Sequence, residues 1–326
     1  MTIFSSRNIC VSFILTTFCF LIWLISKHNY LNQIYEAKST NYTPIKYYFG
    51  NKTSQSLFNS SKHYTFNLSH CWTDLDYELW KQEKYFPPNT SRGNIVYMVM
   101  TGNSFLRSRC DVMMCTFGVT LHPSRLFFVG ETSYDNRLPI YDVVTPDTRR
   151  PVDRSGSMQK LAQGLSMIVE KINNSIDKNE IQWIMVMDDD TFISPLNLEL
   201  LVSEYDPRYS LIIGQSTCGV GFCGGAGYVI SKKLFNQFPS FITKCKPSFG
   251  MSQSDQFVPY CIKKRISVEF INRKEFNSQP PDYYSTELGY KDHPDGFGRA
   301  VSFHYIRSAE KYVALWRLHQ AYMKPR

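Results

Sequence analysis

The chain has 326 residues, of which 43% are hydrophobic and 15% aromatic, and its formal net charge is +8. This composition excludes a disordered chain, and the length suits one large domain with a shorter segment before it. The positive charge does not indicate a nucleic-acid partner, because Lys and Arg are scattered and form only short runs, at residues 149–150 and 263–265.

An uncharged apolar segment, residues 9–25, lies between Arg7 and Lys27. At about 1.5 Å per residue it just crosses a bilayer core of about 30 Å, and it is longer than the apolar region of about 7 to 15 residues in a signal peptide. No small-x-small cleavage pattern follows it. We therefore expect a cytoplasmic tail at residues 1–8 and an uncleaved transmembrane signal anchor at residues 9–26. A cleaved signal peptide is the alternative.

Residues 27–92 show no sustained helical or strand periodicity. They contain Asn-x-Ser/Thr sequons at Asn41, Asn51, Asn59, Asn67 and Asn89. Clustered sequons are typical of a surface segment of a secreted chain, so we expect a glycosylated lumenal stem. The alternative is an Asn- and Ser-rich linker whose sequons are incidental. In both cases the segment is a spacer that places residues 93–326 in the lumen.

Seven cysteines follow the anchor, and an oxidising lumen favours disulfides over zinc for them, because the two Cys-x4-Cys pairs lack the two-residue spacing of zinc knuckles. They are Cys71, Cys110, Cys115, Cys218, Cys223, Cys245 and Cys261. Because the number of cysteines is odd, at least one thiol cannot be paired within the chain. Cys71 is a candidate for an intermolecular bridge, which would make the protein a disulfide-linked homodimer.

From residue 93 onward, strand and helix patterns alternate. Short apolar runs predict strands, and the apolar residues between 155 and 175 repeat at i, i+3, i+4 and i+7, which predicts an amphipathic helix. The predicted strands are residues 95–100, 126–129, 141–144, 181–187, 211–213 and 227–231, and the predicted helices are residues 105–117, 155–175 and 196–205. This order predicts an α/β domain with a mainly parallel sheet covered by helices.

Three consecutive carboxylates, Asp188, Asp189 and Asp190, follow the buried strand at residues 181–187. In open α/β sheets, ligands bind beyond the carboxyl ends of the strands. Carboxylate oxygens are also the ligands that hard divalent cations prefer. We therefore expect a metal ion here, and the alternative is a solvated acidic turn that caps the next helix.

A glycine-rich segment, residues 219–227, formally contains the dinucleotide-binding pattern Gly-x-Gly-x-x-Gly. A strand rather than a helix follows it, and no acidic residue lies near the position about 20 residues further on where a ribose would be held. We reject this pattern as a dinucleotide site. The glycines are expected to let the backbone pass close to a ligand or to another strand.

Several segments resemble, in order, the signature of the fringe-like β-1,3-glycosyltransferases. They are residues 107–114, 183–191, 223–231, 254–255 and 300–306. The last of them, Ala-Val-Ser-Phe-His-Tyr-Ile, is most similar to the core 1 β3-galactosyltransferases. The resemblance covers residues 95–323. The chain departs from the family at Phe117, where the family has Trp, and in residues 219–223, which are shorter and richer in cysteine.

The resemblance implies a GT-A fold, a single-pass type II Golgi membrane protein, a UDP-sugar donor, Mn²⁺ and a glycoprotein or glycan acceptor. Asp190 and His304 match the metal ligands of the family, Asp188 belongs to the same motif, and Asp255 matches the general base. Cys245 and Cys261 resemble a cysteine pair of the core 1 enzymes, so we expect them to be bridged. Donor-binding residues are expected to be Thr101, Arg107, Arg109, Lys160, Asp188, Asp189, Gly224 and Gly225.

The function expected from these residues is inverting transfer of galactose from UDP-galactose to O-linked GalNAc on glycoproteins. Fringe-type transfer of N-acetylglucosamine to O-fucose is the near alternative. A non-catalytic lumenal chaperone of the same fold would not need the metal residues. A membrane-anchored glycan-binding module would not need Asp255.

Overall fold

The structure is a computed structural model that describes residues 74–83, 93–130, 137–143, 155–216, 222–246, 254–281, 283 and 296–322. These residues belong to one compact unit, Ser54–Arg326. The predicted cytoplasmic tail, signal anchor and most of the stem lie outside the described residues, together with Cys71 and the sequons from Asn41 to Asn89. Among the helices of the described part, none has the length and apolar character that a membrane span requires.

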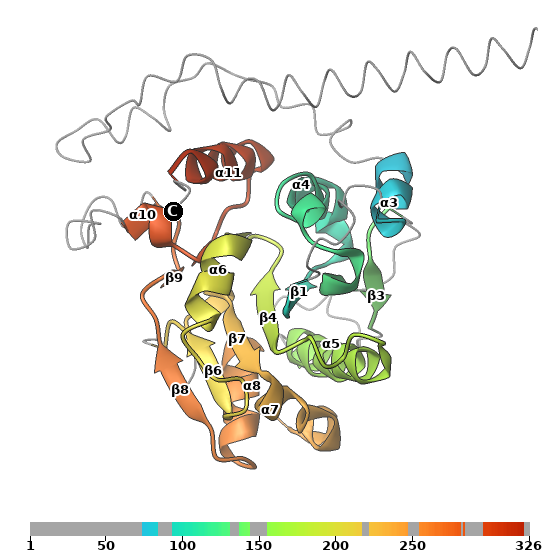
Figure 1. The fold of residues 1–326 in the computed structure, drawn as a ribbon, viewed down its shortest axis with the longest axis vertical. Coiled ribbons are helices and arrows are strands. Elements are labelled where there is room, and N and C mark those ends of the chain that lie inside the picture. Colours follow the sequence, from blue (N-terminus) through green and yellow to red (C-terminus); the bar gives the residue numbers. More distant parts are fainter. Residues whose placement is uncertain are drawn as a thin grey trace, which may run out of the picture. The chain divides into compact units, whose positions relative to one another are not determined.

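A mainly parallel sheet forms the centre of the described structure (Figure 1). Its strand order is β3-β2-β1-β4-β7-β6-β8, and β7 alone runs antiparallel to its neighbours within the described part. The strands are β1 (Ile95–Met100), β2 (Leu126–Gly130), β3 (Ile140–Asp142), β4 (Trp183–Asp188), β6 (Leu211–Gly214), β7 (Tyr228–Ser231) and β8 (Glu269–Asn272). The α/β fold class predicted from the sequence is confirmed.

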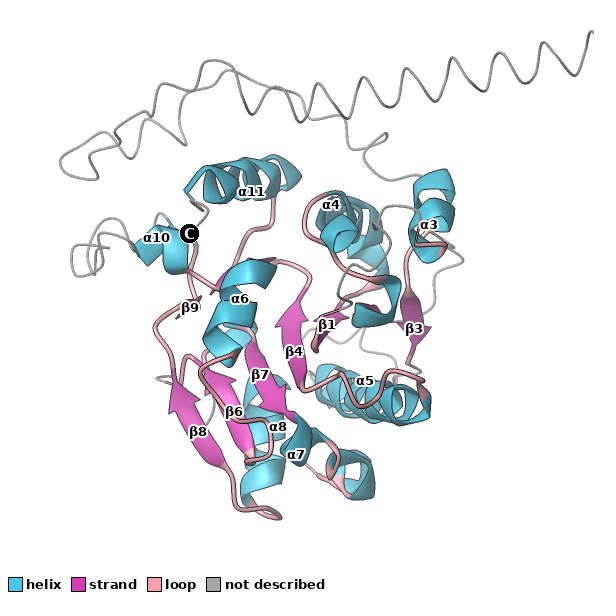
Figure 2. Ribbon diagram, in the orientation of Figure 1, coloured by secondary structure: helices cyan, strands magenta, loops and turns pink. Residues whose placement is uncertain are grey.

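The central strands are apolar throughout because helices cover both faces of the sheet (Figure 2). Along β1, alternate side chains enter two separate cores, with Tyr97 in one and Met98 in the other. The first core contains residues of α4 (Asp111–Cys115), α6 (Pro195–Val202) and α11 (Ala309–Tyr322), and the second contains residues of α5 (Ser155–Asn174), α7 (Lys232–Phe235) and α8 (Ser254–Lys263).

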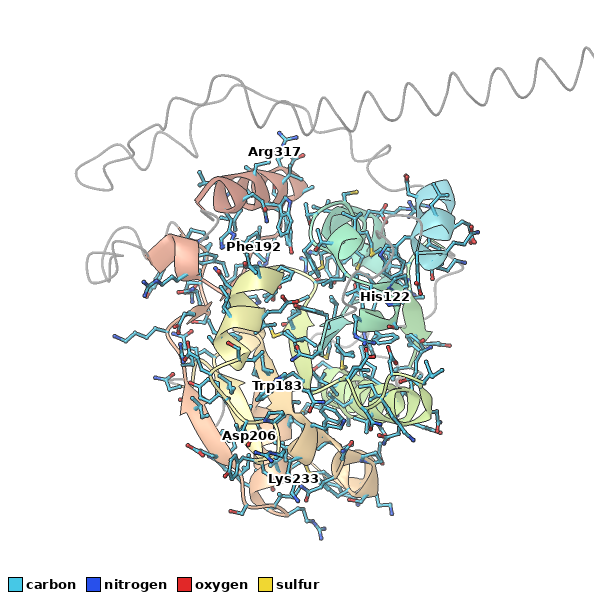
Figure 3. The ribbon with its side chains drawn as sticks, viewed as in Figure 1. His122, Trp183, Phe192, Asp206, Lys233 and Arg317 are labelled. Atoms are coloured by element: carbon cyan, nitrogen blue, oxygen red, sulfur yellow. A yellow bond between two sulfur atoms is a disulfide. The ribbon has the colours of Figure 1, made fainter. Side chains whose placement is uncertain are left out.

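A small second sheet joins distant parts of the chain. It consists of β5 (Phe192–Ile193), β10 (Ser302–Phe303) and β9 (Phe276–Asn277), with β10 in the middle. Phe192 contacts both Phe303 of β10 and Tyr312 of α11, and Figure 3 shows it between α11 and α6. Through this sheet, the segment that follows α10 (Gly296–Arg299) lies beside the segment that follows β4.

Two local predictions from the sequence need correction. Residues 105–117 are not one α-helix, because a 3₁₀ turn (Asn103–Phe105) and a π-helical turn (Leu106–Cys110) precede α4. The range predicted as stem also contains a helix, α3 (Asp74–Lys81). Its Trp80 is buried in the first core and donates from Nε1 to the Leu121 carbonyl at 2.9 Å. A helix this short is stabilised by such packing rather than by its own periodicity.

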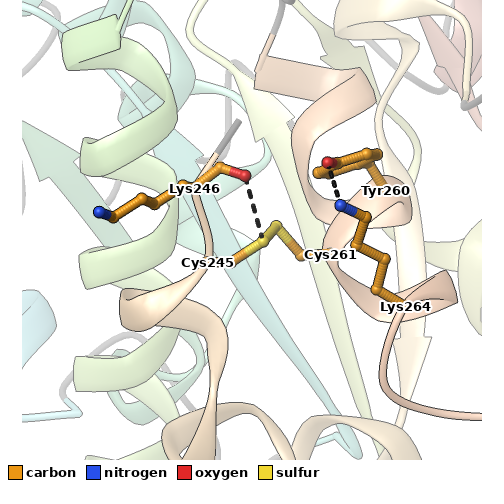
Figure 4. Close-up of a disulfide and its surroundings, with 5 residues drawn as sticks. All are labelled: Cys245, Lys246, Tyr260, Cys261 and Lys264. Atoms are coloured by element: carbon orange, nitrogen blue, oxygen red, sulfur yellow. Dashed lines mark hydrogen bonds between the residues drawn. A yellow bond between two sulfur atoms is a disulfide. The ribbon is translucent and has the colours of Figure 1, made fainter. Parts of the chain in front are cut away.

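The expected disulfide between Cys245 and Cys261 is confirmed (Figure 4). It ties the chain just after a 3₁₀ turn (Ile242–Lys244) to α8, across a separation of 16 residues. Cys115 and Cys223 each take part in a disulfide as well. Among the described cysteines the free thiol is Cys110, and it is buried. It therefore does not offer an intermolecular bridge, and bridging through Cys71 stays a prediction.

Replacing Cys245 by Ser, where the side chain is partly exposed, and Cys261 by Ala, where it is buried, removes this bond with little change in packing. We expect the free energy of unfolding to fall by about 3 kcal/mol, because the unfolded chain regains the freedom of a loop of about 16 residues. Urea denaturation monitored by circular dichroism measures this change. An unchanged urea concentration at the midpoint of unfolding, with an unchanged dependence of the unfolding free energy on urea, would contradict this expectation.

Candidate active site

The site lies at the carboxyl ends of β1 and β4, which are parallel neighbours. Met100 and Asp188 are register partners, so the residues that follow them meet beyond the edge of the sheet. The backbone N–H of Asp189 donates to the Met100 carbonyl at 3.0 Å, and Thr101 Oγ1 donates to Asp189 Oδ2 at 2.7 Å. The end of β1 thus holds the middle carboxylate in place.

Arg109 reaches the same carboxylate from the π-helical turn. Its Nη1 lies 2.5 Å from Asp189 Oδ1 and 3.7 Å from Asp190 Oδ2, and its guanidinium stacks on the Phe105 ring, 3.8 Å from the centroid. Burial raises the pKa of Asp189 even though hydrogen bonds from Thr101 and Arg109 act to lower it. A π-helical turn is a common device for re-aiming a side chain at a functional site, and here it carries Arg109.

The structure separates the remaining predicted donor residues. Lys160 on α5 donates from Nζ to the Thr101 carbonyl at 2.9 Å, so it joins the cluster at the end of β1. Arg107 is exposed, and Arg109 contacts Asp189 and Asp190. Gly224 and Gly225 lie in the 3₁₀ turn η6 (Gly224–Ala226).

His304 completes a set of potential metal ligands with Asp188 and Asp190. The antiparallel pairing of β10 with β5 brings it there. Its backbone N–H donates to the Asn277 carbonyl at 3.0 Å, and the N–H of Ile306 donates to the Asp190 carbonyl at 2.9 Å. His304 Nε2 lies 3.1 Å from Asp190 Oδ1 and 4.0 Å from Asp188 Oδ2.

These three side chains fit one divalent ion. One ligand atom from each lies within 4.8 Å of the other two. In an octahedral shell with ligand bonds of about 2.1 Å, neighbouring ligands are about 3 Å apart and opposite ligands about 4 Å apart. The distances of 3.1 and 4.0 Å from His304 Nε2 to the two carboxylates fall close to these values. Asp190 and His304 are buried and Asp188 is partly exposed, so the set is open on the Asp188 side.

Gly225 fits against the imidazole of His304. A Cβ placed on Gly225 would lie 2.2 Å from His304 Nε2, closer than any real contact, and Thr191 donates from Oγ1 to the Gly225 carbonyl. The glycine therefore lets η6 pass directly over the histidine. In this structure Gly225 makes room for the side chain of a potential metal ligand. The donor contact predicted for Gly225 stays a prediction.

Asp190 is surrounded by His304 and two arginine side chains. Burial by itself raises the pKa of Asp190, but hydrogen bonds from His304 and Arg307 and the nearby charge of Arg109 outweigh burial, so the pKa is lowered. The ionised carboxylate is the form that binds a metal ion. Arg307, which no pattern in the sequence singles out, also contacts this carboxylate, with its Nε 3.2 Å from Asp190 Oδ2.

The sequence matches the family model described as Fringe-like over residues 90–312, which is more than half of the chain. The chain belongs to the Fringe-like family. A human relative of this Fringe-like chain, chondroitin sulfate glucuronyltransferase, is 21% identical over 152 residues, which are 44% of this chain and 19% of that protein. The matched part is thus about a fifth of that relative.

Two solved glycosyltransferases are also similar to the Fringe-like chain. Apo GlyE of Streptococcus pneumoniae has 13% sequence identity and a TM-score of 0.40, with 71% of this chain and 63% of that chain covered. The galactosyltransferase LgtC, in complex with donor and acceptor sugar analogues, has 10% identity and a TM-score of 0.37, with 68% of this chain and 95% of that chain covered.

Asp255, the predicted general base, lies in the first turn of α8. This helix contacts η6, the turn that covers His304. The backbone of the Fringe-like domain therefore brings the helix that carries Asp255 next to the metal-binding set. The Asp255 side chain lies outside the description, and its role as a base stays a prediction.

Gly225→Ala tests the packing of η6 on His304. The added methyl group must displace the imidazole from the metal-binding set, so we expect the affinity for Mn²⁺ to fall about tenfold or more, as for other substitutions that support a metal ligand. Calorimetric titration of Mn²⁺ measures this loss. Gly102→Ala is the matched control, because the nearest atom to its Cβ is 3.8 Å away on Phe105. Equal Mn²⁺ affinities in Gly225→Ala and wild type would show that the ring is not positioned by Gly225.

Proposed function

We propose that this Fringe-like protein is a metal-dependent, inverting β-1,3-glycosyltransferase that uses a UDP-sugar donor. The observation that carries the proposal is the convergence of Asp188, Asp190 and His304 within ligand distance of one another. They lie at the end of the sheet where Thr101 and Arg109 also gather. Membership of the Fringe-like family supports the same reaction class.

In this proposal Asp188, Asp190 and His304 hold Mn²⁺, which when bound neutralises the diphosphate of the donor as it leaves. Arg109 and Thr101 fix Asp189 beside these ligands, so the carboxylates keep their geometry before the donor arrives. Asp255 takes the proton of the acceptor hydroxyl while that oxygen attacks the anomeric carbon. The new glycosidic bond forms as the bond to UDP breaks on the opposite face, which inverts the anomeric configuration.

The donor is proposed to be UDP-galactose and the acceptor O-linked GalNAc on glycoproteins. This rests on the resemblance of residues 300–306 to the core 1 β3-galactosyltransferases, the glycoprotein-N-acetylgalactosamine 3-β-galactosyltransferases. A fringe-type transfer of N-acetylglucosamine to O-fucose is the alternative. The protein is further proposed to be a single-pass type II Golgi membrane protein with the catalytic domain in the lumen.

A transfer assay with a panel of donors and acceptors tests these proposals. UDP-galactose and UDP-N-acetylglucosamine are each paired with a GalNAc-peptide and a fucosylated acceptor, in Mn²⁺ and in excess EDTA. We expect galactose transfer to the GalNAc-peptide, loss of transfer in EDTA and recovery when Mn²⁺ is restored, because the ligand set suits a divalent ion. Full activity in EDTA would remove the metal from the mechanism. Absence of transfer in every pairing would favour a chaperone or a glycan-binding module.

Asp255→Asn tests the proposed base. The amide keeps the size of the carboxylate but cannot accept the acceptor proton, so turnover should fall by about 10²-fold or more. UDP affinity should stay near wild type, because other residues hold the diphosphate and the metal. Turnover, UDP binding and the melting temperature are measured on the same preparation.

The matched control for this variant is Asp206→Asn, which removes a surface carboxylate paired with Arg208. It should leave turnover unchanged. If Asp255 were only a helix cap, Asp255→Asn would cost about 1 kcal/mol of stability and leave the turnover of the folded fraction intact. That pattern would exclude Asp255 as the base.

A further inference from the structure

Arg307 contacts the metal-binding set with only part of its hydrogen-bonding capacity. Its Nε donates to Asp190 Oδ2 at 3.2 Å, whereas its two Nη groups make no hydrogen bond to any residue in the described part of the chain. A guanidinium carries five N–H donors in a planar fork that matches phosphate and carboxylate oxygens. Four of those donors have no hydrogen-bond partner in the described structure.

The two arginines of the site differ in their freedom to move. The side chain of Arg307 is 63% exposed, and that of Arg109 is 15% exposed. Arg109 is also held by Asp189 and by the Phe105 ring. Arg109 is therefore a fixed part of the carboxylate cluster, whereas Arg307 has room to change its partner.

The backbone at residues 304–307 holds Arg307 beside Asp190, with its side chain largely exposed. Tyr305 has a φ of +62°, in the left-handed region that is uncommon for a residue with a bulky side chain. Backbone bonds on either side hold it there, from the His304 N–H to Asn277 and from the Ile306 N–H to Asp190. Such a conformation persists where the surroundings fix it, and it is frequent at ligand-binding sites.

The ring of Tyr305 contacts both His304 and Arg307. It stacks on the His304 imidazole with centroids 3.9 Å apart, and the Arg307 guanidinium lies over it at 4.9 Å from the centroid. His304 and Arg307 then approach opposite oxygens of one carboxylate, Oδ1 and Oδ2 of Asp190. The aromatic ring gives the guanidinium a support that does not depend on the carboxylate.

A metal ion on Asp188, Asp190 and His304 changes the balance of charge around Arg307. Such an ion would add two positive charges beside the guanidinium and would draw on the same carboxylate, so the contact between Arg307 and Asp190 would weaken. A diphosphate bound to that ion would bring negative oxygens close to the same guanidinium. A guanidinium that loses a carboxylate and gains two phosphate groups keeps a charged partner throughout.

We propose that Arg307 binds the diphosphate of the nucleotide-sugar donor, exchanging Asp190 Oδ2 for phosphate oxygens when the metal-binding set is loaded. This rests on the proposed function, because it takes a nucleoside diphosphate as the ligand. It adds Arg307 to Arg107 and Arg109, the two arginines that the sequence predicts to bind the donor. The competing view is that Arg307 forms only a surface ion pair, which contributes little.

Equilibrium binding to the full-length protein distinguishes the two views. The titrants are Mn²⁺ alone, UDP in saturating Mn²⁺, and uridine, which lacks both phosphates, in saturating Mn²⁺. The variants are Arg307→Gln, Arg307→Lys and the control Arg317→Gln. Arg317 is an exposed arginine on α11 that points outward in Figure 3.

For Arg307→Gln we expect UDP affinity to fall about tenfold, the scale of a hydrogen bond to a charged group. Uridine affinity should not change, and Mn²⁺ affinity should stay the same or rise, because a competing cation has been removed from Asp190. Arg307→Lys should restore part of the UDP affinity, since it keeps the charge but loses the fork. Arg317→Gln should match wild type in all three titrations.

Unchanged UDP affinity in Arg307→Gln would overturn the proposal. So would an equal loss of UDP and uridine affinity, which would indicate an altered site rather than a lost phosphate contact. A fall in Mn²⁺ affinity would show that Arg307 supports the ligands instead of competing with the ion, and would also overturn it. If the wild-type protein bound Mn²⁺ but not UDP, the proposed function itself would be wrong, and this inference would fall with it.

Discussion

Three consecutive carboxylates at the end of a buried strand are the constraint on which the site depends. Carboxylates that leave water together repel one another and need cationic or hydrogen-bonding partners. The partners of Asp189 are Arg109 and Thr101, and those of Asp190 include His304 and Arg307. The π-helical turn and the return of the chain through β10 both serve to deliver these partners.

Each of the two sheets positions different residues of the site. The large sheet sets the register of β1 and β4, which brings Thr101 beside Asp189 with little freedom of adjustment. The small sheet brings in His304 from the far end of the chain. Phe192 stabilises that return because it packs against Phe303 of β10 and against Tyr312, Trp316 and His319 of α11. Aromatic packing thus fixes a residue that a short pair of strands would hold weakly.

The sequence was informative where one segment decides its own structure. The apolar run before Asp188 could be predicted as a buried strand because both of its faces are covered, and the amphipathic repeat of α5 could be predicted from its spacing. The sequence was uninformative where a contact between distant segments determines the local structure. The π-helical turn at Leu106–Cys110 has the composition of an ordinary helix, and its Arg109 contacts Asp189, 80 residues away.

The same limit explains the other residues that sequence reasoning missed. Trp80 becomes buried through its contact with Leu121, which no local pattern of α3 reveals. Strands β5 and β10 have two residues each, too few for an alternation to be visible. Arg307 meets Asp190 across 117 residues, so its place in the site appears only in three dimensions. His304 was found because the residues around it resemble a family motif, and not from any property of its own segment.

The separation of the three potential metal ligands along the chain has a consequence for biosynthesis. On the ribosome, Asp188 and Asp190 are made long before His304, so the nascent domain has a complete β4 but an incomplete set of ligands. Binding of an ion to all three ligands and docking of the last strand and helix are linked equilibria, and each stabilises the other. An ability of the three ligands to retain an ion would therefore be acquired last, and it would mark chains whose carboxyl-terminal segment has docked correctly.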